Sequence, residues 1–306
     1  ARIRTCAHTR SGAGLNAGAS TITIVANSNG DGTGSFAAAN GTLIQTTDGT
    51  AAAVSITVNT ATGTGGLGAA AIQTGAAGTV TLNANGGAIT DNNAAATNVT
   101  SGVLIASGAL GVNLDTSIDF LTANSTNTAI SIRETNGVAV NTVNAGTGTV
   151  TLTLTAGAIT DNNPALTLNV TAGLLDATGP AGINLDTAID FLTASSTGTP
   201  ITIRETNGVA VNGVDAGAGT VTLTLAAGAI TDNNGATNNI TATSLVASAV
   251  NGIDLDTTVT DATLTNTGAG NVLIDEVDAL NLLGLSVANG NALITAGGAL
   301  TDGNSA

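Results

Sequence analysis

A tandem repeat of about 70 residues constrains this sequence more than any other feature, because such a period indicates a fold built from copies of one unit. The phrase GTVTL begins at residues 78, 148 and 219, and GAITDNN follows it in each copy. The chain therefore divides into irregular N-terminal coils at 1–77, repeat 1 at 78–147, repeat 2 at 148–218, a diverged repeat 3 at 219–296, and the start of a fourth repeat at 297–306.

A shorter period lies inside each repeat. In repeat 2, apolar runs begin near Val150, Leu166, Ile183 and Ile201, with an average step of about 18 residues. Apolar residues alternate with Thr at 150–155, which predicts strands with one apolar face. The Gly, Asn and Asp residues between the runs tolerate the positive φ of tight corners.

These periods predict an all-β fold, a right-handed parallel β-helix (β-solenoid) with about 18 residues per coil and four coils per 70–71-residue repeat. Each coil of a solenoid buries its inner face against its neighbours. The apolar residues are almost all Ala, Val, Leu and Ile, with three Phe as the only aromatic residues. This composition suits a narrow core of identical layers; an array of repeating β-sandwiches is the weaker alternative.

The phrase GTVTLTLTAGAITDNN at 148–163, followed by LTLNVTAG at 166–173, resembles the repeats of filamentous-haemagglutinin-like proteins and autotransporter passengers. The block at 183–211, which contains INLDT and RETNGVAV, is similar to repeats of other large bacterial secreted proteins. The resemblance covers residues 78–306. It implies a right-handed β-helix, export to the cell surface, and a role in adhesion, biofilm or fibre formation.

The charge of the chain disfavours several classes of partner. The net charge is −15, with five Arg and no Lys. Nucleic acids and anionic membrane surfaces need clustered cations, so neither is an expected partner. No apolar run approaches the length that spans a bilayer, so membrane insertion is not expected. Cys6 is the only cysteine, and an intrachain disulfide is therefore excluded.

The sequence predicts a secreted or cell-surface structural component, namely a fibre, stalk or filament that associates with itself end to end. The alternative is an adhesin that recognises a host receptor or a polysaccharide. An ice-binding solenoid is less favoured, because Asn184, Asp186 and Arg204 interrupt the rows of Thr. Enzyme activity is not expected, because the single His8 lies outside the repeats and leaves them without a Ser–His–Asp triad.

Two Asp–Arg pairs are the most informative polar feature of the repeats. Asp115 precedes Arg133 by one predicted coil length, and Asp186 precedes Arg204 by the same interval. The members of each pair should therefore lie on adjacent coils about 4.8 Å apart. We predict structural ion pairs between coils, each contributing less than about 1 kcal/mol if exposed.

Repeat 3 has Asp275 at the position of this Arg, opposite Asp254 or Asp256 on the preceding coil. Carboxylates that face one another repel unless a cation lies between them, and Ca²⁺ prefers several such oxygens. We therefore expect either a Ca²⁺ site at Asp254, Asp256, Asp275 and Glu276 or a solvated acidic face at the same residues. No other cofactor is expected.

The ITDNN corners recur too far apart to share a metal ion. Their Asp91, Asp161 and Asp232 are separated by a whole repeat in each case. Asn in such corners is expected to form side-chain hydrogen bonds or left-handed turns. The repeats also contain the glycosylation sequons Asn98, Asn124, Asn169 and Asn239.

Overall fold

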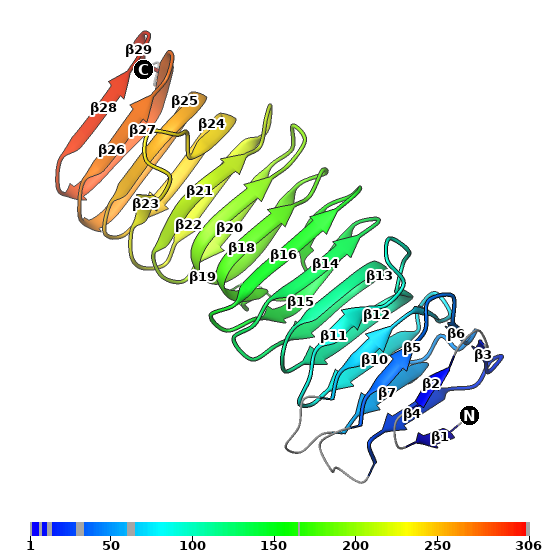
Figure 1. Ribbon diagram of the computed structural model, residues 1–306. Coiled ribbons are helices and arrows are strands. Elements are labelled where there is room, and N and C mark those ends of the chain that lie inside the picture. Colours follow the sequence, from blue (N-terminus) through cyan, green and yellow to red (C-terminus); the bar gives the residue numbers. More distant parts are fainter. Residues whose placement is uncertain are drawn as a thin grey trace. The chain divides into compact units, whose positions relative to one another are not determined.

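The computed structural model describes residues 2–5, 8–10, 14–28, 34–59, 65–164 and 166–303. They fall into two units, Ala1–Ala156 and Gly157–Ala306. Each unit is a parallel β-solenoid, and every regular element among the described residues is a strand (Figure 1). The described residues form about 12 turns of about 20 residues each. The predicted all-β parallel solenoid is confirmed.

The described part of the first unit contains strands β1 to β16, blue to green in Figure 1. Their bounds are β1 Arg2–Thr5, β2 His8–Arg10, β3 Leu15–Asn16, β4 Ile22–Ala26, β5 Phe36–Ala38, β6 Leu43–Gln45, β7 Val54–Val58, β8 Leu67–Ala69, β9 Ala71–Gln73, β10 Thr79–Ala84, β11 Ile89–Asp91, β12 Val99–Gly108, β13 Val112–Asn124, β14 Ile130–Glu134, β15 Val138–Asn144 and β16 Thr149–Leu154.

The described part of the second unit contains strands β17 to β29, green to red in Figure 1. Their bounds are β17 Ile159–Asp161, β18 Val170–Thr178, β19 Ile183–Ser195, β20 Ile201–Glu205, β21 Val209–Asp215, β22 Thr220–Leu225, β23 Ile230–Asp232, β24 Ile240–Ala249, β25 Ile253–Ala269, β26 Val272–Glu276, β27 Leu280–Asn289, β28 Ala292–Ala296 and β29 Leu300–Asp302.

The strands alternate between buried and more exposed residues, as the sequence predicts. In β16, Val150, Leu152 and Leu154 are buried, whereas Thr151 and Thr153 face outward. Aliphatic side chains of one turn therefore contact aliphatic side chains of the next. Burying such a side chain contributes roughly 1.5–3 kcal/mol, and the repeat supplies this contribution turn after turn.

The turns are longer and less equal than the sequence predicts. In the second unit, the register partners from β19 onward are Ile183, Ile201, Val221, Leu245 and Ala262, which follow one another at unequal intervals along the chain. In the first unit, β4 pairs with β7 so that Ile22 lies opposite Val54, an even wider interval. Segments inserted at the corners make the turns unequal in length. The mean length of a turn is about 20 residues.

A repeat consequently makes about three and a half turns and not the predicted four, because the mean turn is longer than predicted. Ile183 and Ile253 occupy the same position in successive repeats. Ile183 lies in the stack that continues through Ile201. Ile253 lies in the other stack of the same unit, between Ile230 and Val272. Equivalent residues of repeats 2 and 3 therefore lie on different faces of the second unit.

Candidate functional site

The polar corner after β17 (Ile159–Asp161) is the most elaborate polar feature of the second unit. Ile159 pairs with Ile183, and Val170 pairs with Thr187, so a long segment of one turn lies opposite a short segment of the next. The surplus residues leave the strand and return at β18. Leu166, which the sequence places at the start of an apolar run, lies here instead, 82% exposed and with φ of 69°.

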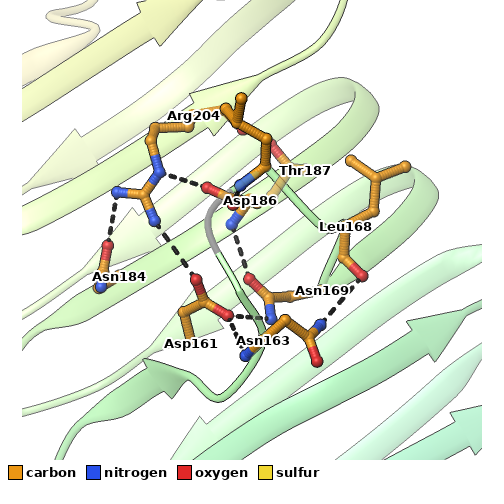
Figure 2. Close-up of polar contacts among 9 residues, drawn as sticks. Asp161, Asn163, Leu168, Asn169, Asn184, Asp186, Thr187 and Arg204 are labelled. Carbon is orange, nitrogen blue, oxygen red and sulfur yellow. Dashed lines mark hydrogen bonds and ion pairs between the residues drawn. The ribbon is translucent and has the colours of Figure 1, made fainter.

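Arg204 links three successive turns at this corner (Figure 2). Its Nε donates to Asp186 Oδ1 on the adjacent turn, and its Nη2 lies 3.6 Å from Asp161 Oδ2 on the turn before that. Its Nη1 donates to Asn184 Oδ1 at 2.9 Å. The structure thus brings Arg204 and Asp186 together as register partners and adds Asp161, which sequence reasoning assigned only to a corner.

The corresponding corner of the first unit has the same arrangement. Arg133 Nε lies 2.5 Å from Asp115 Oδ1, and Nη2 lies 3.8 Å from Asp91 Oδ2. Asp115 and Arg133 are register partners of β13 and β14. Close contact with the Asp115 carboxylate raises the pKa of Arg133, since an adjacent negative charge favours the protonated guanidinium.

Three buried asparagines hold these corners, and sequence reasoning missed their role. Asn98 donates through Nδ2 to Ala69 O, Asp91 Oδ1 and Asn93 Oδ1 at 2.7–2.9 Å. Its Oδ1 accepts the backbone N–H of Asp115 at 2.7 Å. One amide thus connects the preceding turn, its own corner and the following turn.

Asn169 and Asn239 take the same place in the second unit. Asn169 accepts from the Asp186 N–H at 2.8 Å, and Asn239 accepts from the Asp256 N–H at 2.7 Å. Asn98, Asn169 and Asn239 are each 0% exposed. These three sequons are therefore buried structural residues, and the recurrence of Asn-Val/Ile-Thr at one repeat position was the available signal.

A buried glutamate recurs after each of these corners. In the second unit, Glu205 is 2% exposed, and its Oε2 accepts from Thr187 Oγ1 at 2.7 Å and Ile189 N at 3.1 Å. Its Oε1 accepts from the backbone N–H groups of Thr206 and Asn207 at 2.8 and 3.1 Å. Burial raises the pKa of Glu205, and these hydrogen bonds oppose the rise only in part. Glu134 in the first unit has the same environment and a pKa raised for the same reason.

The predicted Ca²⁺ group in repeat 3 does not assemble as a set of four. Asp256 and Asp275 are register partners and face outward. Glu276 is the next residue on β26 (Val272–Glu276) and points inward, because side chains alternate along a strand. Its Oε2 accepts from Thr257 Oγ1 at 2.7 Å and Val259 N at 3.0 Å, so Glu276 does not belong to the acidic group.

The remaining carboxylates of repeat 3 affect one another electrostatically. Burial, followed by the charges of Asp232, Asp275 and Asp254, raises the pKa of Asp256. In the described residues, no group of three or more His, Cys, Asp or Glu side chains is arranged to hold a metal ion. In the place of the guanidinium of the other repeats, repeat 3 has the Asp275 carboxylate opposite Asp256.

A cavity of about 500 Å³ opens beside the corner of the first unit. A much smaller one of about 120 Å³ occupies the equivalent place in the second unit, where Leu166 and Leu168 line it. The polar residues around the larger cavity are Asp91, Thr97, Asp115, Arg133, Glu134, Thr135 and Thr155.

The single histidine and the single cysteine lie near the N-terminus. His8 belongs to β2, whose side chains the structure does not describe, and Cys6 lies outside the described residues. The described parts of the chain contain no helix that is long and apolar enough to span a membrane. Comparisons with protein-family models, with curated proteins and with solved structures give no match.

Proposed function

We propose that this chain is a structural component of an extracellular bacterial surface fibre, stalk or filament. One observation carries the proposal: the polar side chains of the repeat corners are used to join one turn to the next. Arg204 contacts carboxylates of two preceding turns, and Asn98 connects three turns in the other unit. A solenoid gains stability from contacts between neighbouring turns, so this arrangement suits a protein whose role is mechanical.

The proposed location at the cell surface has separate support. The phrase at 148–163 resembles repeats of large secreted bacterial proteins, and the net charge of −15 favours solubility outside the cell. An antibody raised against the purified chain should label intact cells of the source organism without permeabilisation. Labelling only after permeabilisation would contradict the proposed location.

Self-association is the proposed mode of assembly. In β27, β28 and β29, the apolar side chains of Leu285, Leu293 and Leu300 are 41%, 62% and 51% exposed. Such strands bind further strands readily, because they offer unpaired backbone groups beside an apolar surface. Strands of a second copy would cover these side chains.

Electron microscopy of the purified chain, combined with light scattering over a range of concentrations, tests the structural role. We expect thin fibres whose mass increases with concentration and which resist thermolysin. Leu293→Asp should shorten the fibres, whereas Asp190→Asn, an exposed change on β19 (Ile183–Ser195), should leave them unchanged. Compact particles of constant monomer mass would rule out assembly of the chain on its own.

A further inference from the structure

The cavity at the corner of repeat 1 is about 500 Å³, whereas the chain itself fills most of its counterpart in repeat 2, which is about 120 Å³. In repeat 2, the backbone N–H of Leu166 donates to Asp186 Oδ2 at 2.8 Å, and Arg204 Nη1 donates to Asn184 Oδ1. Leu168 lines the remaining space of about 120 Å³. The Asp186 carboxylate and the Arg204 guanidinium in this corner thus form hydrogen bonds with other groups of the chain.

In repeat 1, the corresponding positions lack those partners. Asp115 is 9% exposed, and its Oδ1 pairs with Arg133 Nε at 2.5 Å, so only its second carboxylate oxygen is available to a ligand. Within the described part of the chain, no backbone N–H donates to the Asp115 carboxylate, and Arg133 Nη1 has no hydrogen-bond acceptor. A ligand hydroxyl can therefore donate to the second Asp115 oxygen, and another can accept from Arg133 Nη1.

We propose that this cavity binds a neutral pyranose sugar through two adjacent hydroxyl groups. One hydroxyl donates to the Asp115 carboxylate, and its neighbour accepts from Arg133 Nη1. Each hydroxyl both donates and accepts, so a vicinal diol matches this acceptor–donor pair. The volume of about 500 Å³ lies within the range of about 300–1,000 Å³ that is usual for small-molecule pockets.

The charges around the cavity select against ionic ligands. Asp91 and Asp115 outnumber the single cation Arg133, and the buried Glu134 adds a further acidic group to the lining. Anions are therefore repelled, while Arg133 already occupies the place of a cation between the two Asp carboxylates. The hydroxyls of Thr97 and Thr155 and the methyl groups of Ala94 and Ala95 offer polar and apolar contacts, as a sugar ring requires. This site goes beyond the structural role and does not depend on it.

Saturation-transfer NMR on the full chain tests the site with methyl α-D-glucopyranoside, methyl α-D-mannopyranoside and methyl β-D-galactopyranoside, and with acetate as the anionic probe. We expect transfer to at least one glycoside at millimolar concentration and none to acetate. No transfer to any glycoside, or transfer to acetate alone, would overturn the proposal.

Matched variants locate the binding. Arg133→Met removes the donor and should weaken the bound glycoside at least about tenfold, the loss of roughly 1.4 kcal/mol. Arg204→Met makes the same change at the smaller cavity of repeat 2 and should leave binding unaltered. Thr97→Leu introduces the side chain found at Leu168 and should also abolish binding while preserving the far-UV circular dichroism. Equal binding by the wild type and both cavity variants would place the sugar elsewhere and refute the site.

Discussion

At the scale of single residues, the buried asparagine of each repeat shows how much structure one side chain can hold. Asn98 Nδ2 lies within hydrogen-bond distance of three acceptors, and its Oδ1 accepts one backbone N–H, so the side chain connects three turns although it is fully buried. Removing such a group leaves its buried partners without hydrogen bonds, and each unsatisfied partner costs about 1–3 kcal/mol.

Asn98→Ala should therefore destabilise the first unit by about 2–4 kcal/mol, because the Asp115 N–H and Asn93 Oδ1 lose their partner. Urea unfolding followed by circular dichroism measures the loss. Asn124→Ala, at a more exposed sequon, serves as the control and should change the free energy of unfolding by less than about 0.5 kcal/mol. Similar losses in the two variants would show that the buried hydrogen bonds contribute little.

Asp275 offers a second test at this scale, because Arg occupies its position in the other repeats. Asp275→Arg should form the ion pair with Asp256 that Arg204 forms with Asp186, and it removes a charge that repels Asp256. We expect stabilisation by up to about 1 kcal/mol, larger at low salt. Asp190→Arg makes the same charge change in the same unit, and an equal gain there would indicate a general charge effect.

At the scale of strands and corners, the sequence predicts the inner and outer faces well. The alternation at 150–155 identifies buried Val150 and Leu152 because a strand has a period of two. The spacing of Asp186 and Arg204 equals one local turn and so predicts register partners. Corner insertions have no comparable period, and Leu166 consequently resembles a core residue although it is exposed.

The candidate site is less accessible to sequence reasoning than the strands. The contact between Asp161 and Arg204 depends on the shape of an irregular segment. The cavity of repeat 1 depends on small side chains at Ala95 and Thr97, whose effect appears only when the corner is folded. Sequence spacing specifies neighbours along a stack of turns, and it does not specify how an inserted segment fills space.

The buried glutamates predict an unusual dependence on pH. The folded-state pKa of Glu205 is raised above its unfolded value, so the native state binds the proton more tightly. Above the folded-state pKa, the buried negative charge of Glu205 destabilises the fold. This destabilisation disappears as the pH falls to the ordinary Glu pKa of about 4.5. Acidification through this window should therefore not weaken the fold at this residue.

Thr187→Val isolates this effect, because it removes the hydroxyl that donates to Glu205 Oε2. The pKa of Glu205 should rise further, and the melting temperature should fall more at pH 7.5 than at pH 5. Thr202→Val, which lies outward on β20 (Ile201–Glu205), is the control and should show no such difference. An equal loss for Thr187→Val at both pH values would show that the hydroxyl does not act through the carboxylate.

At the scale of the whole molecule, each unit is a stack in which a turn contacts only its neighbours. Cooperativity in such a stack is local, because stability is approximately a sum over turns and their interfaces. Damage to one turn should therefore spread over a limited distance. This behaviour distinguishes a solenoid from a globular domain with a single core.

Val221→Asp places a charge in the core of the second unit, where Val221 is 0% exposed. Hydrogen–deuterium exchange should accelerate most in its register neighbours, β20 and β24 (Ile240–Ala249), and least in β28 (Ala292–Ala296). Thr222→Asp, its outward neighbour, should produce little change. A uniform loss of protection throughout the unit would show that it unfolds as a single body.

The half-turn remainder of each repeat has a consequence for how such a chain can grow by duplication. Each added repeat contributes an odd number of half-turns. The surface residues of the new copy therefore lie on the side of the solenoid opposite to those of the preceding copy. In the second unit, Arg204 and its counterpart Asp275 lie in different stacks for this reason. Only a second duplication restores the original side. If the protein is lengthened by one repeat at a time, successive copies therefore carry the same surface residues on alternating sides of the solenoid. To present those residues on one side only, every second copy must change its sequence at these positions.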